Sequence, residues 1–180
     1  MCLSERLISE IRNEFPEFRV VPKAGSRLSR CIDLWLKVVT LGGQRTYLTE
    51  YHTVLGSTLY VGNSWEAASD VERAILLCHE RVHLRQRRRL GMVLMTFLYL
   101  FPFFPLGLAY GRARLEWEAY TETLRTTAEL QGVDAIRDPA LREKIVGRFT
   151  GPAYGFMWPF RRQVERWFDQ VVSELTSRGT

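Results

Sequence analysis

Apolar residues recur at intervals of three and four over five stretches of the chain, which is the spacing of an amphipathic helix. The stretches are residues 3–14, 71–84, 112–130, 140–148 and 161–175. Pro16 ends the first predicted helix, because proline lacks an amide hydrogen. Ser69, with Glu72 three residues later, predicts a capping box at the start of the second helix.

An alternation with a period of two replaces the helical spacing between residues 33 and 61. It predicts strands at residues 33–40, 45–55 and 58–61, with a hairpin turn at Gly42-Gly43. We therefore expect an α+β fold, in which a small, mostly antiparallel sheet precedes a helical half of the chain. The length of 180 residues and the hydrophobic content of 46% predict one domain that spans residues 1–180.

The formal net charge is +5, and arginines cluster at positions 85, 87, 88 and 89. Because cations are stabilised at a helix C-terminus, a solvated helix end is favoured over a contact with nucleic acid. The three cysteines lack the number and spacing of a disulfide framework. The first residues include no apolar segment typical of a signal peptide, so we expect a cytoplasmic protein.

His79 and His83 lie four residues apart in a predicted helix, so both imidazoles project from one face. Together with Glu80 they form the sequence His-Glu-Arg-Val-His, an H-E-x-x-H pattern. In this pattern the two histidines bind a zinc ion, and the glutamate activates a zinc-bound water. Since the chain has only three histidines, finding two of them at this spacing favours a metal site over coincidence.

A catalytic zinc ion takes three protein ligands, and no histidine follows His83. The predicted helix 112–130 offers Glu116 and Glu118, which are about 200° apart on the helical wheel. Glu118 lies on the charged face of this helix. Glu116 lies among small and aromatic residues, where a carboxylate is costly without a partner. We therefore predict Glu116 as the third ligand, with Glu118 as the first alternative and the upstream His52 as the second.

The pattern His79-Glu80-x-x-His83 followed by Glu116-x-x-Ala119 resembles the gluzincin metallopeptidases. The resemblance covers roughly residues 55–125. It implies a zincin-like fold, Zn²⁺ as the cofactor, and hydrolysis of peptide bonds in a peptide or protein substrate. The chain departs from the family at Tyr120, where the family has an aspartate that orients a ligand histidine. A catalytically inactive zincin-fold binding protein is therefore the alternative.

The resemblance implies two further roles. A strand at the edge of the cleft binds the substrate backbone by strand addition, and the candidates are Leu59, Tyr60 and Val61. A second electrophile besides zinc stabilises the developing oxyanion. Tyr154, in an aromatic loop with several glycines and prolines, is the first candidate for that catalytic role. Tyr120 and, more remotely, His52 are the alternatives.

Residues 90–111 include no charged side chain and are long enough to suggest a membrane span. A single span would separate the two histidines from Glu116, and Pro102 and Pro105 interrupt a long helix. We therefore expect a buried connection. The alternative is a hairpin at a membrane surface or partner protein, with arginines on either side facing anionic headgroups. A peptidase tethered to nucleic acid or membrane through its arginine cluster is a related alternative.

Overall fold

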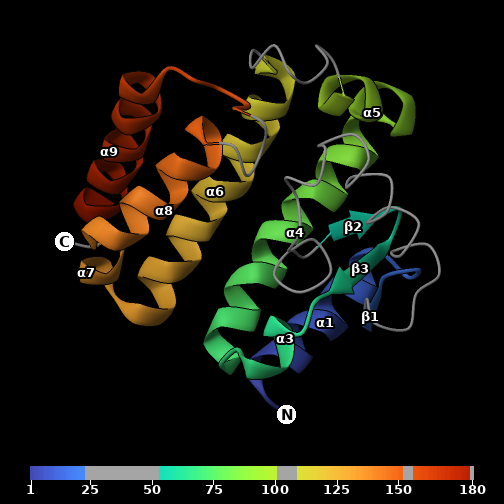
Figure 1. The fold of residues 1–180 in the computed structure, drawn as a ribbon. Coiled ribbons are helices and arrows are strands. Elements are labelled where there is room, and N and C mark those ends of the chain that lie inside the picture. Colours follow the sequence, from blue (N-terminus) through green and yellow to red (C-terminus); the bar gives the residue numbers. More distant parts are fainter. Residues whose placement is uncertain (23–52, 101–108, 152–155, 179–180) are drawn as a thin grey trace. The chain divides into compact units, whose positions relative to one another are not determined.

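The computed structural model describes residues 1–22, 53–100, 109–151 and 156–178, and most of these residues are helical (Figure 1). The chain divides into two units, Met1–Glu80 and Arg81–Thr180. The border falls inside the continuous helix α4 (Asp70–Leu90), so this helix begins in the first unit and ends in the second.

The first unit combines a small sheet with helices. Its elements before α4 are α1 (Leu3–Glu14), β1 (Arg19–Pro22), β2 (Thr53–Leu55), β3 (Thr58–Val61) and α3 (Ser64–Ala67). The strand order is β1-β3-β2, with β1 parallel and β2 antiparallel to β3. Gly56, with φ of 62°, lies in the tight turn between β2 and β3, where a residue with a side chain would be strained.

The expected α+β fold with a mostly antiparallel sheet is therefore wrong. In the described part of the chain, helices dominate and the sheet contains one parallel and one antiparallel pair. The four residues of β1 are too few to show an alternation, and they pair with a strand far along the chain. The predicted strand at 33–40, and most of the one at 45–55, lie outside the described residues.

The position of β3 also corrects the predicted role of Leu59, Tyr60 and Val61. β3 is the central strand of the described sheet, and it is hydrogen-bonded to β1 on one side and to β2 on the other. Leu59 and Val61 are buried. Since strand addition requires an unpaired edge, these three residues do not offer the expected surface for a substrate backbone.

The carboxylate of Asp70 anchors helix α1 to the start of α4. It accepts hydrogen bonds from the backbone amides of Leu3 and Ser4, at 2.7 and 3.0 Å, and from the Ser4 hydroxyl. These hydrogen bonds, above all that from the Ser4 hydroxyl, lower the pKa of Asp70 from 3.8 to about 2. The first turn of α1 is thus held by an ionised carboxylate.

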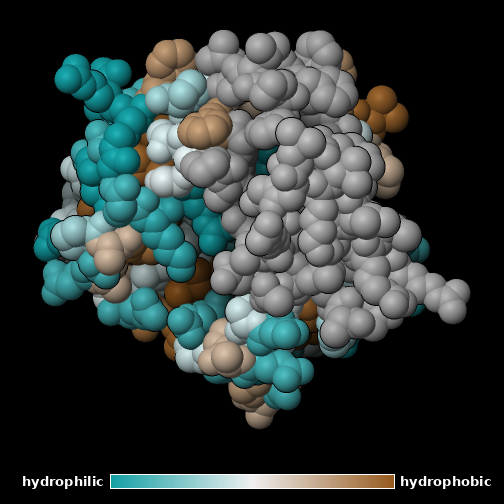
Figure 2. All heavy atoms as spheres, viewed as in Figure 1, coloured by the Kyte–Doolittle hydropathy of each residue, from teal (hydrophilic) through white to brown (hydrophobic). Residues whose placement is uncertain are grey.

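Within its described residues, the second unit contains the end of α4 and five further helices. They are α5 (Met92–Leu100), α6 (Tyr110–Gln131), α7 (Val133–Ile136), α8 (Pro139–Thr150) and α9 (Arg161–Arg178). Trp117 and Tyr120 of α6 contact Phe149 of α8, with ring centroids 6.0 and 5.5 Å apart. The core of this unit lies between α6, α8 and α9. The side chains over α8 and α9 in Figure 2 are mainly hydrophilic.

Helix α5 lies within the apolar stretch at residues 90–111. Gly91, with φ of 76°, separates it from α4. Val93 is 86% exposed and Phe97 is 55% exposed, so the expectation of a buried connection is wrong for the outer face of α5. Among the residues that the structure describes, no helix has both the length and the apolar content needed to cross a membrane.

Candidate metal centre

The start of helix α4 is held by the predicted capping box. The Ser69 hydroxyl accepts a hydrogen bond from the Glu72 amide at 3.2 Å, and the Ser69 amide donates to the Glu72 carboxylate at 2.7 Å. From this start the helix runs without a break to Leu90. His79 and His83 are therefore one turn apart on one helix face. His83 is buried, and His79 is half-buried.

Helix α6 brings a buried carboxylate to His83. Glu116 Oε2 lies 3.8 Å from Nε2 of His83, and Glu116 is only 4% exposed. One ligand atom from each of His79, His83 and Glu116 lies within 4.8 Å of the other two. Ligand atoms of a tetrahedral zinc ion are about 3.4 Å apart, so small side-chain movements suffice to bring the three atoms around one ion.

The side chain of Gln86 determines which nitrogen of His83 carries the proton. Gln86 Nε2 donates to the Leu115 carbonyl and to Glu118 Oε2, both at 2.9 Å. Gln86 Oε1, which lies 2.9 Å from His83 Nδ1, must then be an acceptor. A neutral imidazole would therefore carry its hydrogen on Nδ1, and its Nε2, which lies 3.8 Å from Glu116 Oε2, would be an acceptor. Two acceptors that face each other in a buried position favour a cation between them.

Tyr99 of α5 holds the other oxygen of the same carboxylate. Its hydroxyl donates a hydrogen bond to Glu116 Oε1. Its ring lies edge-on to His83, with centroids 6.1 Å apart, and the Arg112 guanidinium lies 5.3 Å from the ring centroid. Because Tyr99 binds Oε1 of Glu116, the other carboxylate oxygen, Oε2, is the one that faces His83. Sequence reasoning missed this residue; a phenol in an otherwise almost wholly apolar helix was the available signal.

Glu118 has a different environment from Glu116. Its side chain is 41% exposed, pairs with Arg89 at 3.2 Å, and accepts the hydrogen bond from Gln86. The structure therefore places Glu116, and not Glu118, beside His83, as the helical wheel predicts. Tyr120 packs against Phe149 in the core, so it does not occupy the position of an aspartate that orients a histidine. The contact with His83 comes from Gln86 instead.

Of the other predicted site residues, Glu80 lies within the described part of the chain, whereas Tyr154 and His52 do not. Glu80 follows His79 on α4 and is 7% exposed, so the predicted proton acceptor is a buried carboxylate. Its catalytic role stays a prediction.

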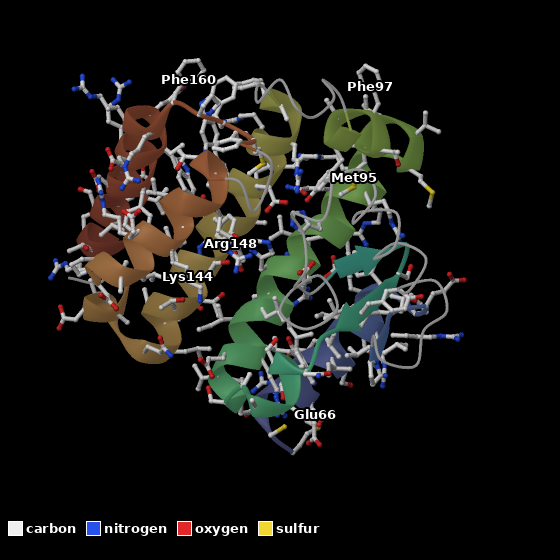
Figure 3. The ribbon with its side chains drawn as sticks, viewed as in Figure 1. Glu66, Met95, Phe97, Lys144, Arg148 and Phe160 are labelled. Carbon is white, nitrogen blue, oxygen red and sulfur yellow. The ribbon has the colours of Figure 1, made fainter. Side chains whose placement is uncertain are left out.

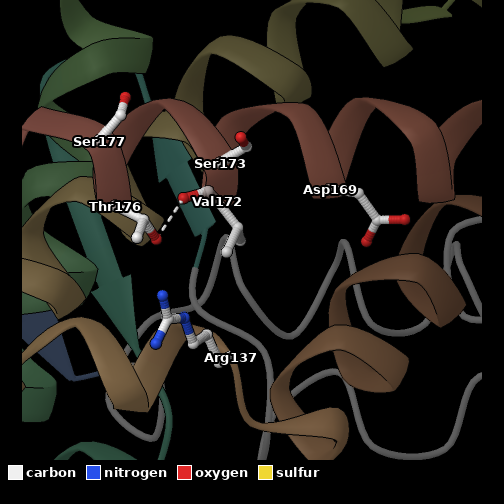
Figure 4. A pocket seen from close by; sticks show the side chains of 6 residues that line it. All are labelled: Arg137, Asp169, Val172, Ser173, Thr176 and Ser177. Atoms are coloured by element: carbon white, nitrogen blue, oxygen red, sulfur yellow. Dashed lines mark hydrogen bonds between the residues drawn. The ribbon is translucent and has the colours of Figure 1, made fainter.

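A separate depression on the second unit lies beside α9 (Figure 4). It is lined by Arg137, Asp169, Val172, Ser173, Thr176 and Ser177. The Thr176 hydroxyl donates to the Val172 carbonyl at 2.8 Å, Arg137 pairs with Asp134, and Asp169 pairs with Arg142. Since these polar groups are engaged by the protein itself, the depression offers no second candidate for a metal or catalytic site.

Comparison of this chain with protein-family models, with curated proteins and with solved structures finds no match. These comparisons therefore identify no zincin fold, and an assignment of function depends on the geometry of the site.

Proposed function

We propose that this protein is a metal-dependent hydrolase of peptide bonds, with His79, His83 and Glu116 as the protein ligands of a Zn²⁺ ion. The observation that carries the proposal is the convergence of two imidazoles and a carboxylate within 4.8 Å. Two histidines and one glutamate are a donor set of catalytic zinc sites, in which a fourth position stays open for water or substrate.

The surroundings of the three residues fit a metal ion. Gln86 directs the lone pair of His83 Nε2 toward the site, and Tyr99 holds the Glu116 carboxylate by its second oxygen. Groups that orient metal ligands in this way raise the affinity of a site, because the ligands lose less freedom on binding. A set of two nitrogens and one oxygen favours zinc over calcium or magnesium, which prefer oxygen ligands alone.

Glu80 is the group that moves the proton in the proposed reaction. Zinc, when bound, supplies a Lewis acid and lowers the pKa of water to about 7. Glu80 accepts a proton from the water whose oxygen forms the new bond to the carbonyl carbon. It then returns that proton to the amine nitrogen as the carbon–nitrogen bond breaks. The immediate products are a carboxylic acid and an amine, which become a carboxylate and an ammonium when the acid proton passes to the amine, so atoms and charges balance. The burial of Glu80 limits competition from bulk water.

A structural ion pair is the competing interpretation of the same residues. His83 Nε2 and Glu116 Oε2, 3.8 Å apart, would attract each other if the imidazole were protonated on both nitrogens. The protein would then be catalytically inactive, and no metal would be required. The hydrogen bonds of Gln86 also accommodate that state, so the two interpretations are separated by the metal content.

The test combines a metal assay with a hydrolysis assay. Purified protein is dialysed against metal-free buffer and its zinc content is measured by mass spectrometry; we expect about one ion per chain. Hydrolysis of fluorescently labelled casein is then followed for the parent protein, for Glu80→Gln and for Glu122→Gln. Glu122 is a matched control because its carboxylate pairs with Arg125 on the surface of α6.

We expect the Glu80→Gln variant to retain zinc and to lose hydrolysis by about 10²–10⁴-fold, which is the usual contribution of a general base. The Glu122→Gln variant should match the parent. A protein that holds no metal, or one that holds zinc but hydrolyses no peptide bond, would contradict the proposal. A Glu80→Gln variant as active as the parent would remove Glu80 from the mechanism.

A further inference from the structure

Large apolar side chains are exposed at one end of the second unit. They are Met92, Val93, Leu94 and Phe97 of α5, Tyr110 at the start of α6, and Phe156 and Phe160 ahead of α9. We refer to these seven residues as the apolar end. Phe97 and Phe160 both lie at the upper edge of this unit in Figure 3 and point outward. Exposed apolar side chains gathered in this way mark an interaction surface.

Two sets of contacts bring these residues to the same end of α6. Helix α5 packs on the first turn of α6 so closely that a Cβ atom on Gly111 would lie 2.8 Å from Cδ2 of Leu98. The Tyr110 ring lies 5.2 Å from Trp158, which in turn lies 5.0 Å from Phe160. The exposed side chains of α5 and those ahead of α9 therefore both adjoin the N-terminus of α6.

The outer face of α5 is distinct from the face that meets the metal centre. Met92, Val93 and Phe97 are exposed, whereas Leu98 and Tyr99 are partly buried. At about 100° per residue, Val93 and Phe97 lie about 40° apart on the helical wheel, and both lie more than about 100° from Tyr99. A partner on that face can bind without displacing Tyr99 from Glu116.

Several arginines lie close in sequence to the residues of the apolar end. They are Arg87, Arg88 and Arg89 at the end of α4, Arg114 in α6, and Arg162 and Arg166 in α9. Phe160 and three of the α9 arginines, with Gln163, line a shallow groove that includes no acidic side chain. The Arg162 side chain is exposed and, among the described residues, has no hydrogen-bond or ion-pair partner. The border of the apolar end is thus suited to an anionic surface.

We propose that the apolar end docks on the surface of an anionic lipid bilayer. Val93 and Phe97 enter the boundary between headgroups and acyl chains, and Arg162 and Arg166 meet the lipid phosphates. Helix α5, with nine residues, is about 14 Å long, against a hydrocarbon core of about 30 Å. It therefore lies along the surface. A second copy of the chain is a poorer occupant, because a symmetric contact would bring the same arginines together.

Vesicle flotation of the full chain tests this proposal. The protein is mixed with vesicles of phosphatidylcholine alone or with vesicles that also contain phosphatidylglycerol, and bound protein is measured after centrifugation. The Val93→Ser/Phe97→Ser double variant removes the apolar contact. Leu130→Ser is the matched control, because Leu130 is a 38% exposed leucine at the opposite end of α6. Arg162→Gln and Arg166→Gln test the charge, with Arg125→Gln as the control.

We expect flotation only with vesicles that contain phosphatidylglycerol. The Val93→Ser/Phe97→Ser variant should bind at least about tenfold more weakly, and each arginine variant about fivefold more weakly. The two controls should bind like the parent. Because the substituted side chains are exposed, circular dichroism of all variants should match the parent.

Three results would overturn the proposal. They are an absence of flotation with either vesicle, equal flotation with both, or flotation that the double variant leaves unchanged. A concentration-dependent dimer that dissociates in the Val93→Ser/Phe97→Ser variant, in protein that does not float, would assign this surface to a second copy instead. None of these measurements depends on hydrolysis, so the proposed function can fail while this inference stands.

Discussion

The side-chain oxygen of Gln86 lies 2.9 Å from Nδ1 of His83, and both residues are buried on helix α4. The amide nitrogen of Gln86 donates to the Leu115 carbonyl and to Glu118. These bonds fix the amide, and the fixed amide orients the imidazole. The hydrogen-bond partner of His83 thus comes from one turn further along its own helix, and not from the position of Tyr120.

Substitution Gln86→Leu should therefore weaken metal binding. The variant keeps a similar volume but removes the acceptor for His83 Nδ1, so the imidazole loses its preferred tautomer and orientation. We expect zinc affinity to fall by about 10–100-fold, measured by competition with a chromophoric chelator. Arg89→Gln, which also removes a partner of Glu118 but does not touch His83, is the control. Equal affinity in the Gln86→Leu variant and the parent would show that this hydrogen bond does not support a ligand.

The two glutamates of α6 should respond differently to substitution. Glu116→Gln removes the buried carboxylate beside His83 and should abolish most zinc binding, because a neutral amide is a much weaker ligand. Glu118→Gln should have a smaller effect, since its side chain pairs with Arg89 and supports the site only through Gln86. Isothermal titration with zinc compares the two. Greater loss in the Glu118→Gln variant would mean that Glu116 is not a ligand.

Substitution Tyr99→Phe should destabilise the second unit and lower its zinc affinity. The change removes the hydroxyl that donates to Glu116, leaving a buried carboxylate oxygen with one donor fewer. A hydrogen bond to a charged group contributes about 1.5–3 kcal/mol, which urea unfolding of the metal-free protein can detect. Tyr110→Phe is the control, because the Tyr110 side chain is 51% exposed. An equal effect of the two substitutions on stability would show that the hydrogen bond from the Tyr99 hydroxyl to Glu116 does not stabilise the fold.

The anchoring of α1 should depend on pH through Asp70. Because its hydrogen bonds from Leu3 and Ser4 lower its pKa from 3.8 to about 2, the folded first unit binds this proton less readily than the unfolded chain. The stabilisation is complete above pH 3.8 and is lost as the pH falls toward about 2. The backbone amides of α1 should therefore be less protected against hydrogen exchange at the acid end of this range than above it. A peptide that covers α1 reports this protection.

In the Asp70→Asn variant, the amides of α1 should be as weakly protected at the higher pH as those of the parent are at the acid end of the range. Acidification should then change their protection little. Asp134→Asn serves as the control, because the Asp134 side chain is 98% exposed and belongs to the second unit. If the protection of α1 in Asp70→Asn kept the pH dependence of the parent, another group would be responsible for it.

The sequence by itself determined the longer helices, α1, α4, α6, α8 and α9, and the local geometry within them. The capping box of Ser69 and Glu72 and the spacing of His79 and His83 are properties of one helix, because they depend on neighbours three or four residues away. The preference for Glu116 over Glu118 also followed from a single helical wheel, since the wheel separates a solvated face from a buried one. Predicted helices at 3–14, 140–148 and 161–175 correspond to α1, α8 and α9 for the same reason.

Only the tertiary structure decided which distant residues complete the site. Tyr99 reaches Glu116 because α5 packs on α6, and Gln86 meets Leu115 because α4 and α6 lie together there. The parallel pairing of β1 with β3 likewise joins segments far apart in the chain. Such contacts leave no periodic trace in the sequence, since they depend on packing and not on spacing. For that reason the hydrogen bond of Tyr99 and the pairing of β1 could be identified only from the folded structure.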